Sequence, residues 1–328
     1  MISIGNNNFK TTAAQFHEGD AVVSIRKRSS LLRISLSFLL LLLCRMLTLC
    51  HSLGGHSNGL RNGQAMKAAT TSIPPYPVRV TVMGGGNFGL ALATVLGRKG
   101  VPTTLLVRKE EIANHLNTKH CHPQYMSDIQ LPSTIVATAD PKNAFSDATY
   151  VIHAVPCQFS REFLSTVKDY IPPYTPVLSA SKGIETGSLG FMTDIMIDCL
   201  GPDRSYAFLS GPSFAREICE GVATAVVIAS KDLFLADDLA VLMSSDTFRC
   251  FTSCDVIGVE VGGAVKNVIA LAAGMCEGLG LGTNAMSGLV TRGCTEMRRL
   301  GDSLGAKPNT LSGLSGELIQ SLYIKLLR

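Results

Sequence analysis

Residues 78–107 read VRVTVMGGGNFGLALATVLGRKGVPTTLLV, and they set the architecture expected for most of the chain. A β-branched apolar run, 78–83, is followed by a glycine-rich turn and then by an apolar, helix-forming segment with a basic end. A second apolar run, 101–107, is again typical of a buried strand. This order predicts a β-α-β unit, from which doubly wound parallel sheets are built.

The turn carries three glycines, Gly84, Gly86 and Gly89, at the GxGxxG spacing, with Gly85 between them. In such a motif the first glycine allows a tight turn, the second lets a pyrophosphate approach, and the third packs the helix against the strand. The following helix adds the positive end of its dipole. A bare motif of this kind can be a plain structural turn, but the flanking strand and helix favour dinucleotide binding.

The end of the second strand bears on the choice of dinucleotide. Arg108 stands where an aspartate or glutamate usually holds the ribose 2′-hydroxyl of NAD, and arginine suits the 2′-phosphate of NADP. Glu110 and Glu111 follow slightly later in the chain. NAD and NADP therefore both stay open.

Further strands are expected at 148–156, 175–185, 206–214 and 222–230. Phe159, Lys182 and the turn from Ser210 through Gly211 to Ser213 follow or end these runs. Because ligands bind beyond the carboxyl ends of strands in open α/β sheets, we expect these residues near the cofactor. A solvated loop lysine is the alternative for Lys182.

Residues 258–275, GVEVGGAVKNVIALAAGM, place Lys266 in small, apolar surroundings with Asn267 beside it. The lysine either extends its stem to bring its ammonium to water or is desolvated. Desolvation lowers a lysine pKa and suits the group to proton transfer.

The length and composition of the chain agree with a globular protein of two domains. It has 328 residues, 46% of them hydrophobic and 16% charged, and a net charge of +4, which does not indicate nucleic-acid binding. The ten cysteines form no CxxC pair, so reduced thiols are expected. His115, His120, Cys121 and His122 cluster but lack a second ligand pair, and no metal is expected.

Residues 1–77 are interpreted as a targeting segment and linker, followed by a dinucleotide-binding domain at 78–250 and a partial helical domain at 251–328. The leader holds an apolar stretch at 34–44, short of the roughly 20 residues that span a bilayer. No carboxylate occurs between Ala21 and Lys109, which is typical of organelle transit peptides. A membrane anchor at 31–50 and a cytoplasmic enzyme with a misassigned start stay open.

Several long segments together resemble the soluble NAD(P)-dependent glycerol-3-phosphate dehydrogenase family. They are VTVMGGGNFGLALA, HAVPCQFSREFL, LSASKGIETGSL, LSGPSFAREI, the long run from DVIGVEVGGAVKNV to EMRRLG, and GLSG, within about 78–316. LVRK, AVPCQF and GAKPNTLSGLSG are similar to the plant plastid branch. The resemblance implies a Rossmann-type domain, a helical domain like that of 6-phosphogluconate dehydrogenase, a homodimer and a place in glycerophospholipid and carbohydrate metabolism.

The resemblance also implies an activity and its residues. The reaction is the interconversion of dihydroxyacetone phosphate and sn-glycerol 3-phosphate, with Lys266 as acid/base and Lys182 contacting both substrate and cofactor. Gly211, Ser213 and Asn267 would line the substrate site. The remaining implied cofactor contacts are Asn87, Phe88, Phe159 and Ala215.

After Gly316 the chain departs from the family pattern and reads ELIQSLYIKLLR. The family's Asp, Thr-Cys and Arg-Asn segment does not follow. The alternative function is therefore a truncated splice form or pseudoenzyme that binds dinucleotide without turnover.

Overall fold

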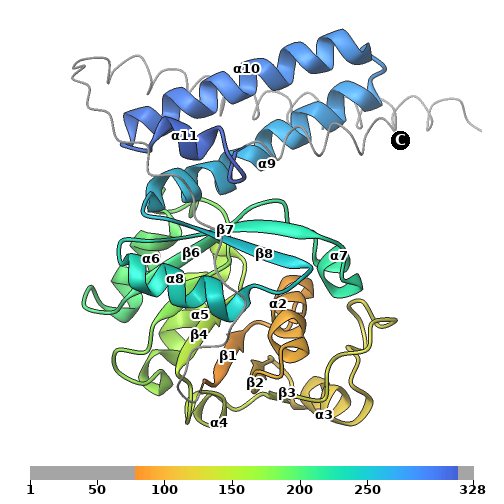
Figure 1. The fold of residues 1–328 in the computed structure, drawn as a ribbon, viewed down its shortest axis with the longest axis vertical. Helices are drawn as coiled ribbons and strands as arrows, with labels where there is room; N and C mark the ends of the chain where they lie inside the picture. Colours follow the sequence, from red (N-terminus) through yellow and green to blue (C-terminus); the bar gives the residue numbers. More distant parts are fainter. Residues whose placement is uncertain (1–77, 317–328) are drawn as a thin grey trace, which may run out of the picture. The chain divides into compact units, whose positions relative to one another are not determined.

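The structure is a computed structural model that describes residues 78–316 (Figure 1). The interpreted leader, with its apolar stretch, and the divergent segment 317–328 lie outside the described residues.

The core element is an eight-stranded sheet in the order β3-β2-β1-β4-β5-β6-β7-β8. Its neighbouring strands are parallel except for the antiparallel pair β6 and β7. The order reverses at β1, so the switch point where such sheets bind ligands lies between β1 and β4. The strands are β1 (Val80–Met83), β2 (Thr103–Leu106), β3 (Ile135–Thr138), β4 (Tyr150–His153), β5 (Val177–Ser179), β6 (Tyr206–Ser210), β7 (Thr224–Ser230) and β8 (Phe248–Ser253).

Helices cover both faces of this sheet, each with its own buried apolar cluster. The described residues form the helices α2 (Asn87–Arg98), α3 (Glu110–Lys119), α4 (Pro141–Phe145), α5 (Cys157–Val167), the 3-10 turn η1 (Lys168–Tyr170), α6 (Met192–Leu200), α7 (Ala215–Glu220), α8 (Leu233–Met243), α9 (Val256–Gly278), α10 (Gly282–Ser303) and α11 (Pro308–Leu311). Residues of α2, α3, α7 and α8 pack in one cluster, and residues of α4, α5 and α6 in the other. The expected doubly wound α/β fold is confirmed.

Three helices follow the sheet within the residues up to 316, with α9 and α10 side by side (Figure 1). Asp255 caps the N-terminus of α9, because its carboxylate accepts from the backbone N–H of Gly258 at 2.9 Å. The same carboxylate accepts from the backbone N–H of Lys307 at 2.8 Å. By length and apolar composition α9 passes for a membrane span, but it packs against β6, α10 and α11 as a core helix does. The helical C-terminal region is thus present, while the domain boundary at residue 250 stays a prediction.

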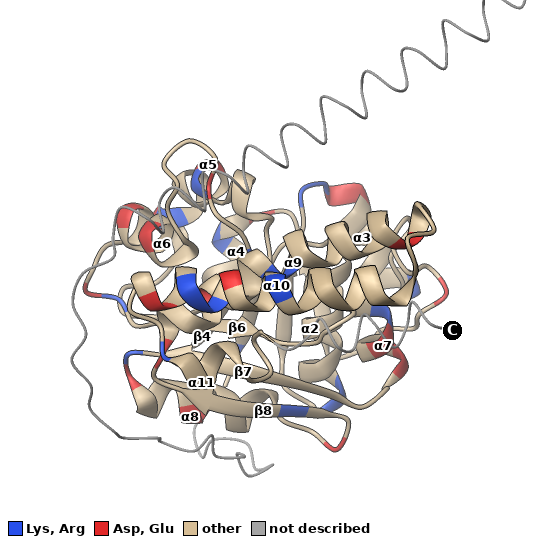
Figure 2. Ribbon diagram, turned by 90° about the horizontal axis from the view of Figure 1, so that it is seen from above, with Lys and Arg blue, Asp and Glu red and all other residues tan. Residues whose placement is uncertain are grey.

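Two strands were not expected from the sequence. The β3 strand pairs with β2, and β8 pairs with β7 at the other edge of the sheet. Basic and acidic residues are interspersed over the described elements (Figure 2).

Of the histidine and cysteine cluster, His115 lies within α3, and His120, Cys121 and His122 follow the end of that helix. His122 accepts from the backbone N–H of Gln124 and Tyr125 through Nδ1 and stacks on the Tyr125 ring. Within 78–316, no group of three or more His, Cys, Asp or Glu residues is arranged to hold a metal.

Candidate functional site

The glycine-rich turn joins β1 to α2 at the switch point of the sheet. Gly84 has a φ of +109°, and a Cβ there would lie 2.9 Å from the Ala154 carbonyl oxygen after β4. A Cβ on Gly89 would overlap the Gly84 carbonyl, so both positions need glycine for packing. Around Gly86, by contrast, a Cβ would meet nothing within 4 Å. The turn thus leaves open space at the N-terminus of α2, which fits a pyrophosphate group.

Lys182 lies beyond the end of β5 and reaches this turn. Its ammonium nitrogen lies 4.6 Å from the centroid of the Phe88 ring, a cation–π arrangement. The side chain is half-buried, and loss of water lowers the pKa of Lys182 to about 8. Sequence position alone did not decide between this placement and a solvated loop lysine.

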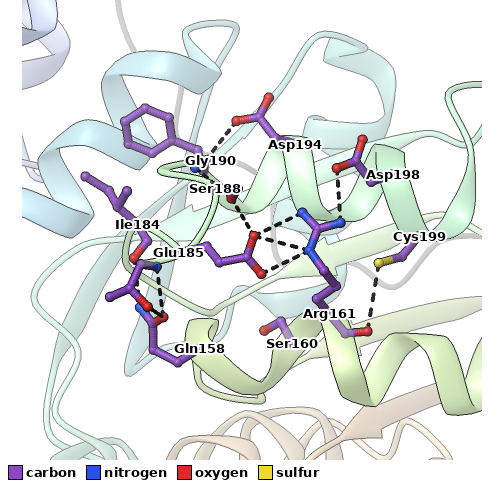
Figure 3. A network of polar contacts seen from close by, with 12 residues as sticks. Gln158, Ser160, Arg161, Ile184, Glu185, Ser188, Gly190, Asp194, Asp198 and Cys199 are labelled. Atoms are coloured by element: carbon purple, nitrogen blue, oxygen red, sulfur yellow. Dashed lines mark hydrogen bonds and ion pairs between the residues drawn. The ribbon is translucent and has the colours of Figure 1, made fainter.

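A polar network holds the loop that carries Lys182 (Figure 3). Arg161 on α5 donates to both carboxylate oxygens of Glu185, at 3.0 and 3.2 Å through Nε, and to Asp198 on α6 at 3.1 Å. Its guanidinium holds the pKa of Glu185 below the usual value. Gln158 donates to the Ile184 carbonyl oxygen at 2.8 Å. The loop is therefore fastened to α5 and α6 just after Lys182.

Lys266 approaches the same region from α9. It is 3% exposed, and its ammonium donates to the carbonyl oxygen of Gly211 at 3.1 Å. Burial, and secondly repulsion from the Lys182 charge, lowers the pKa of Lys266 to about 7. The lysine is thus desolvated and lies within electrostatic reach of Lys182.

Two glycines allow close packing around the end of β6, Gly263 on the side of α9 and Gly211 on the side of β7. A Cβ on Gly263 would lie 2.9 Å from Ser210 Oγ and 3.6 Å from Lys182 Cγ. Gly211 has a φ of +148°, and a Cβ there would lie 2.8 Å from Val226 Cα. The carbonyl oxygen of the buried Gly211 also accepts from Ser213 Oγ at 3.3 Å. The turn after β6 is therefore shaped to meet Lys266.

Most of the other expected site residues are exposed to solvent. Arg108 after β2 is exposed, Phe159 on α5 is 61% exposed, and Asn267 on α9 is exposed. Asn87 at the start of α2 is exposed as well, and Ala215 begins α7 half-buried. The structure thus brings together the glycine-rich turn, which includes Asn87, with Lys182, Lys266 and the turn after β6, whereas Arg108, Phe159 and Asn267 have exposed side chains.

The sequence interpretation gave no role to Glu260. It lies three residues before Gly263 in α9, so these two residues are neighbours on the helix surface. Its carboxylate accepts from the backbone N–H of Thr193 at 2.8 Å and from Thr193 Oγ1 at 2.6 Å. The contact joins positions 67 residues apart, and no local pattern in the sequence signals it.

Comparison with known proteins agrees with this geometry. The family model for the N-terminus of NAD-dependent glycerol-3-phosphate dehydrogenase matches residues 79–236, and the model for its C-terminus matches residues 255–324.

The chain belongs to the NAD-dependent glycerol-3-phosphate dehydrogenase family.

Relatives in this family are substantially similar. The chloroplastic NAD(+) glycerol-3-phosphate dehydrogenase 2 of Arabidopsis thaliana is 42% identical over 265 residues, covering 79% of this chain and 63% of that relative. The chloroplastic enzyme of rice, Oryza sativa subsp. japonica, is 42% identical over 76% of this chain and 58% of its own length. The chain thus matches less than two thirds of either plant relative. The crystal structure of glycerol-3-phosphate dehydrogenase from Coxiella burnetii has a TM-score of 0.71 and 33% identity, with 76% of each chain covered.

Proposed function

We propose that the chain is a glycerol-3-phosphate dehydrogenase that interconverts dihydroxyacetone phosphate and sn-glycerol 3-phosphate with NAD or NADP. The observation that carries the proposal is the pair of desolvated lysines beside the glycine-rich turn. Lys182 lies over Phe88 of that turn, and Lys266 lies within reach of the Lys182 charge. This arrangement suits an anionic substrate held next to a dinucleotide.

The dinucleotide would lie on the switch point of the sheet. Gly84, Gly85, Gly86, Asn87, Phe88 and Gly89 would hold the diphosphate, and Arg108, Phe159, Lys182 and Ala215 would contact the rest of the cofactor. The open space at Gly86 fits this group. When bound, NADH or NADPH supplies the hydride.

Lys266 would be the acid/base of the reaction. Reduction of a ketone leaves negative charge on oxygen, which an ammonium stabilises and then protonates. In the reverse direction the neutral amine accepts the hydroxyl proton. Lys182, Gly211, Ser213 and Asn267 would hold the substrate, and the dianionic phosphate would offset the repulsion between the two lysines.

The cellular setting is proposed from the plant relatives, whose names are chloroplastic. We place the chain in the plastid, as a homodimer in glycerophospholipid metabolism. The acid-poor, basic leader supports a plastid destination. The division into domains at 78–250 and 251–328 belongs to the same proposal.

The test is an activity and binding assay on the purified full chain. We expect NADH or NADPH to be oxidised when dihydroxyacetone phosphate is added. The affinity for each cofactor is measured separately by fluorescence titration. Tight dinucleotide binding without any oxidation would overturn the enzyme proposal in favour of a binding protein without turnover.

A further inference from the structure

The loop that carries Lys182 follows β5 and lies along the start of α5 (Figure 3). Gln158 and Arg161 of α5 contact this loop just after the lysine. The helix begins at Cys157, directly beyond the carboxyl end of β4 at the switch point of the sheet. The loop is therefore held next to the place where a dinucleotide would bind. We call residues 181–186 the lysine loop.

The backbone is fixed on both sides of Lys182. Before the lysine, the Ser181 hydroxyl donates to the carbonyl oxygen of Val155 at 2.5 Å. After it, Gly183 has a φ of +139°, and a Cβ there would lie 3.2 Å from the Cβ of Cys157. Because this conformation favours glycine and the space beside it is nearly filled, the backbone packs directly on the first residue of α5. The backbone position of the lysine is thus tied to the start of that helix.

Gln158 contacts the lysine loop through both ends of its amide group. Its Nε2 donates to the carbonyl oxygen of Ile184 at 2.8 Å, and its Oε1 accepts from the backbone N–H of Thr186 at 3.0 Å. The Thr186 hydroxyl donates to the same oxygen at 3.0 Å. Because the amide group is planar, contacts at both ends fix the orientation of the loop as well as its distance from α5.

Arg161 binds Glu185 of the lysine loop in a bidentate pair. Its Nε donates to the two carboxylate oxygens at 3.0 and 3.2 Å, and a second guanidinium nitrogen donates to Oε2 at 3.0 Å. The Glu185 side chain is 13% exposed, and the Ser188 hydroxyl donates to it at 2.5 Å. Exposed single ion pairs contribute little, whereas a bidentate pair to a largely buried carboxylate keeps its geometry. Glu185 is therefore a fixed anchor shortly after Lys182.

The Lys182 ammonium has neighbours on two other elements. It lies 4.6 Å from the centroid of the Phe88 ring at the start of α2, and its charge acts on Lys266 of α9. A lysine stem is long and flexible, so the ammonium keeps its place only where the backbone that carries it is held. A shift of the lysine loop would move the ammonium relative to both α2 and α9.

We propose that Gln158 and Arg161 are positioning residues that hold the Lys182 ammonium in place for the reaction. This rests on the proposed function, in which Lys182 contacts both substrate and cofactor. The contacts of Gln158 and Arg161 are with the lysine loop and, for Arg161, with Asp198 on α6. Both residues therefore act through Lys182 and not on the substrate.

The first test is Arg161→Met, which keeps most of the stem and removes the guanidinium. We expect kcat/KM for dihydroxyacetone phosphate reduction to fall about 10-fold, since a misplacement of about 1 Å can lower a rate ~10²-fold. Arg216→Met is the matched control, because Arg216 forms a bidentate pair with Asp128 at 2.7 and 2.9 Å on the exposed side of α7. The control is expected to behave like the parent chain. Arg161→Met with the kcat/KM of the parent chain would overturn the proposal.

A double-variant cycle separates positioning from general stability. In a Lys182→Gln chain there is no ammonium to place, so adding Arg161→Met is expected to cause no further fall in kcat/KM. Gln158→Leu is expected to follow the same pattern and replaces Arg161→Met if that variant does not fold, as judged by circular dichroism. Equal losses with and without Lys182 would mean that α5 only stabilises the fold, and the positioning role would be wrong.

The pH profile gives a measurement that a lower stability does not move. Burial, and secondly the charge of Lys182 in the lysine loop, lowers the pKa of Lys266. If Arg161→Met lets the Lys182 ammonium move away, kcat/KM for sn-glycerol 3-phosphate oxidation is expected to rise at a higher pH than in the parent chain. A rise at the same pH would mean that the ammonium keeps its place without Arg161, which contradicts the proposal.

Dinucleotide affinity makes the test independent of turnover. A parent chain that binds NADH but turns over no substrate would overturn the proposed function, and the same cycle read on the Kd for NADH would still decide the positioning role. Arg161→Met is expected to raise this Kd only when Lys182 is present, because Lys182 lies against Phe88 of the turn proposed to hold the diphosphate. Equal increases with and without Lys182 would overturn the positioning role alone. A parent chain that binds no NADH would overturn both proposals.

Discussion

At the scale of the residue, the proposal depends on the ammonium of Lys266. Lys266→Met keeps most of the stem that packs in α9 and removes the charge. We expect kcat to fall at least ~10²-fold, the usual scale of general acid–base catalysis. NADH affinity, measured by fluorescence titration, is expected to stay unchanged because the glycine-rich turn is formed by other elements. Lys231→Met, at an exposed lysine, is the matched control. Near-normal turnover of Lys266→Met would refute the assigned role.

The pH dependence of the rate tests the interaction between the two lysines. Oxidation of sn-glycerol 3-phosphate needs neutral Lys266, so kcat/KM is expected to rise through a pKa of about 7 to a plateau at higher pH. Reduction needs the ammonium and is expected to fall over the same range. Lys182→Gln removes the repulsion that is the second cause of the lowered pKa, after burial. The rise of kcat/KM with pH is therefore expected to occur at higher pH in the Lys182→Gln variant, measured on its residual activity. A rise at the same pH as in the parent chain would show that the two charges are not coupled.

At the scale of the element, the turn between β1 and α2 separates packing from ligand binding. A Cβ on Gly89 would overlap the Gly84 carbonyl oxygen, whereas a Cβ on Gly86 would meet nothing within 4 Å. Gly89→Ala is expected to lower Tm and to weaken NADH binding together. Gly86→Ala is expected to leave Tm unchanged and still raise the Kd for NADH, because the methyl group occupies the space of the pyrophosphate. Calorimetry and fluorescence titration measure the two effects, and Gly86→Ala with normal affinity would contradict the placement of the cofactor.

Much of this element could be predicted from local sequence. The strand, turn and helix at 78–98 depend on neighbours in the chain, so their pattern is visible in a single sequence. The contact of Glu260 with Thr193 joins positions 67 residues apart, and no local pattern encodes it. The same holds for the Phe88 ring under Lys182 and for the Arg161 network that fastens the Lys182 loop. The edge strand β8 has a half-exposed, mixed pattern, which hides its period from a sequence reading.

At the scale of the whole molecule, the site is built by bringing α9 onto the carboxyl end of β6. This contact buries Lys266, and Gly263 provides the room for it. The sheet contributes the glycine-rich turn and Lys182, and the helical region contributes Lys266 and Glu260. The arrangement places Lys182, Lys266 and Glu260, whose pKa values all differ from the ordinary ones, in one region of the molecule. The stability of the fold therefore depends on pH.

Stability is expected to depend on pH through these groups with opposite signs. The folded-state pKa of Glu260 is raised to about 7, so between its ordinary value and pH 7 the folded chain binds more protons than the unfolded one. This contribution lowers the free energy of unfolding as pH rises towards 7. The pKa values of Lys266 and Lys182 are lowered to about 7 and about 8, so above these values the unfolded chain binds more protons and stability rises until the unfolded lysines titrate near 10.5.

Lys266→Met isolates the largest of these contributions. The variant removes a charge whose burial costs on the order of a few kcal/mol, so at pH 7 it is expected to be more stable than the parent chain. The difference should shrink steadily between pH 7 and about 10.5, where the lysine of the parent chain is neutral in both states. Urea unfolding followed by circular dichroism at several pH values measures it, with Lys231→Met as the control. A difference that stays constant over this range would mean that Lys266 keeps an ordinary pKa in the folded chain, and the desolvation on which the proposed proton transfer depends would be absent.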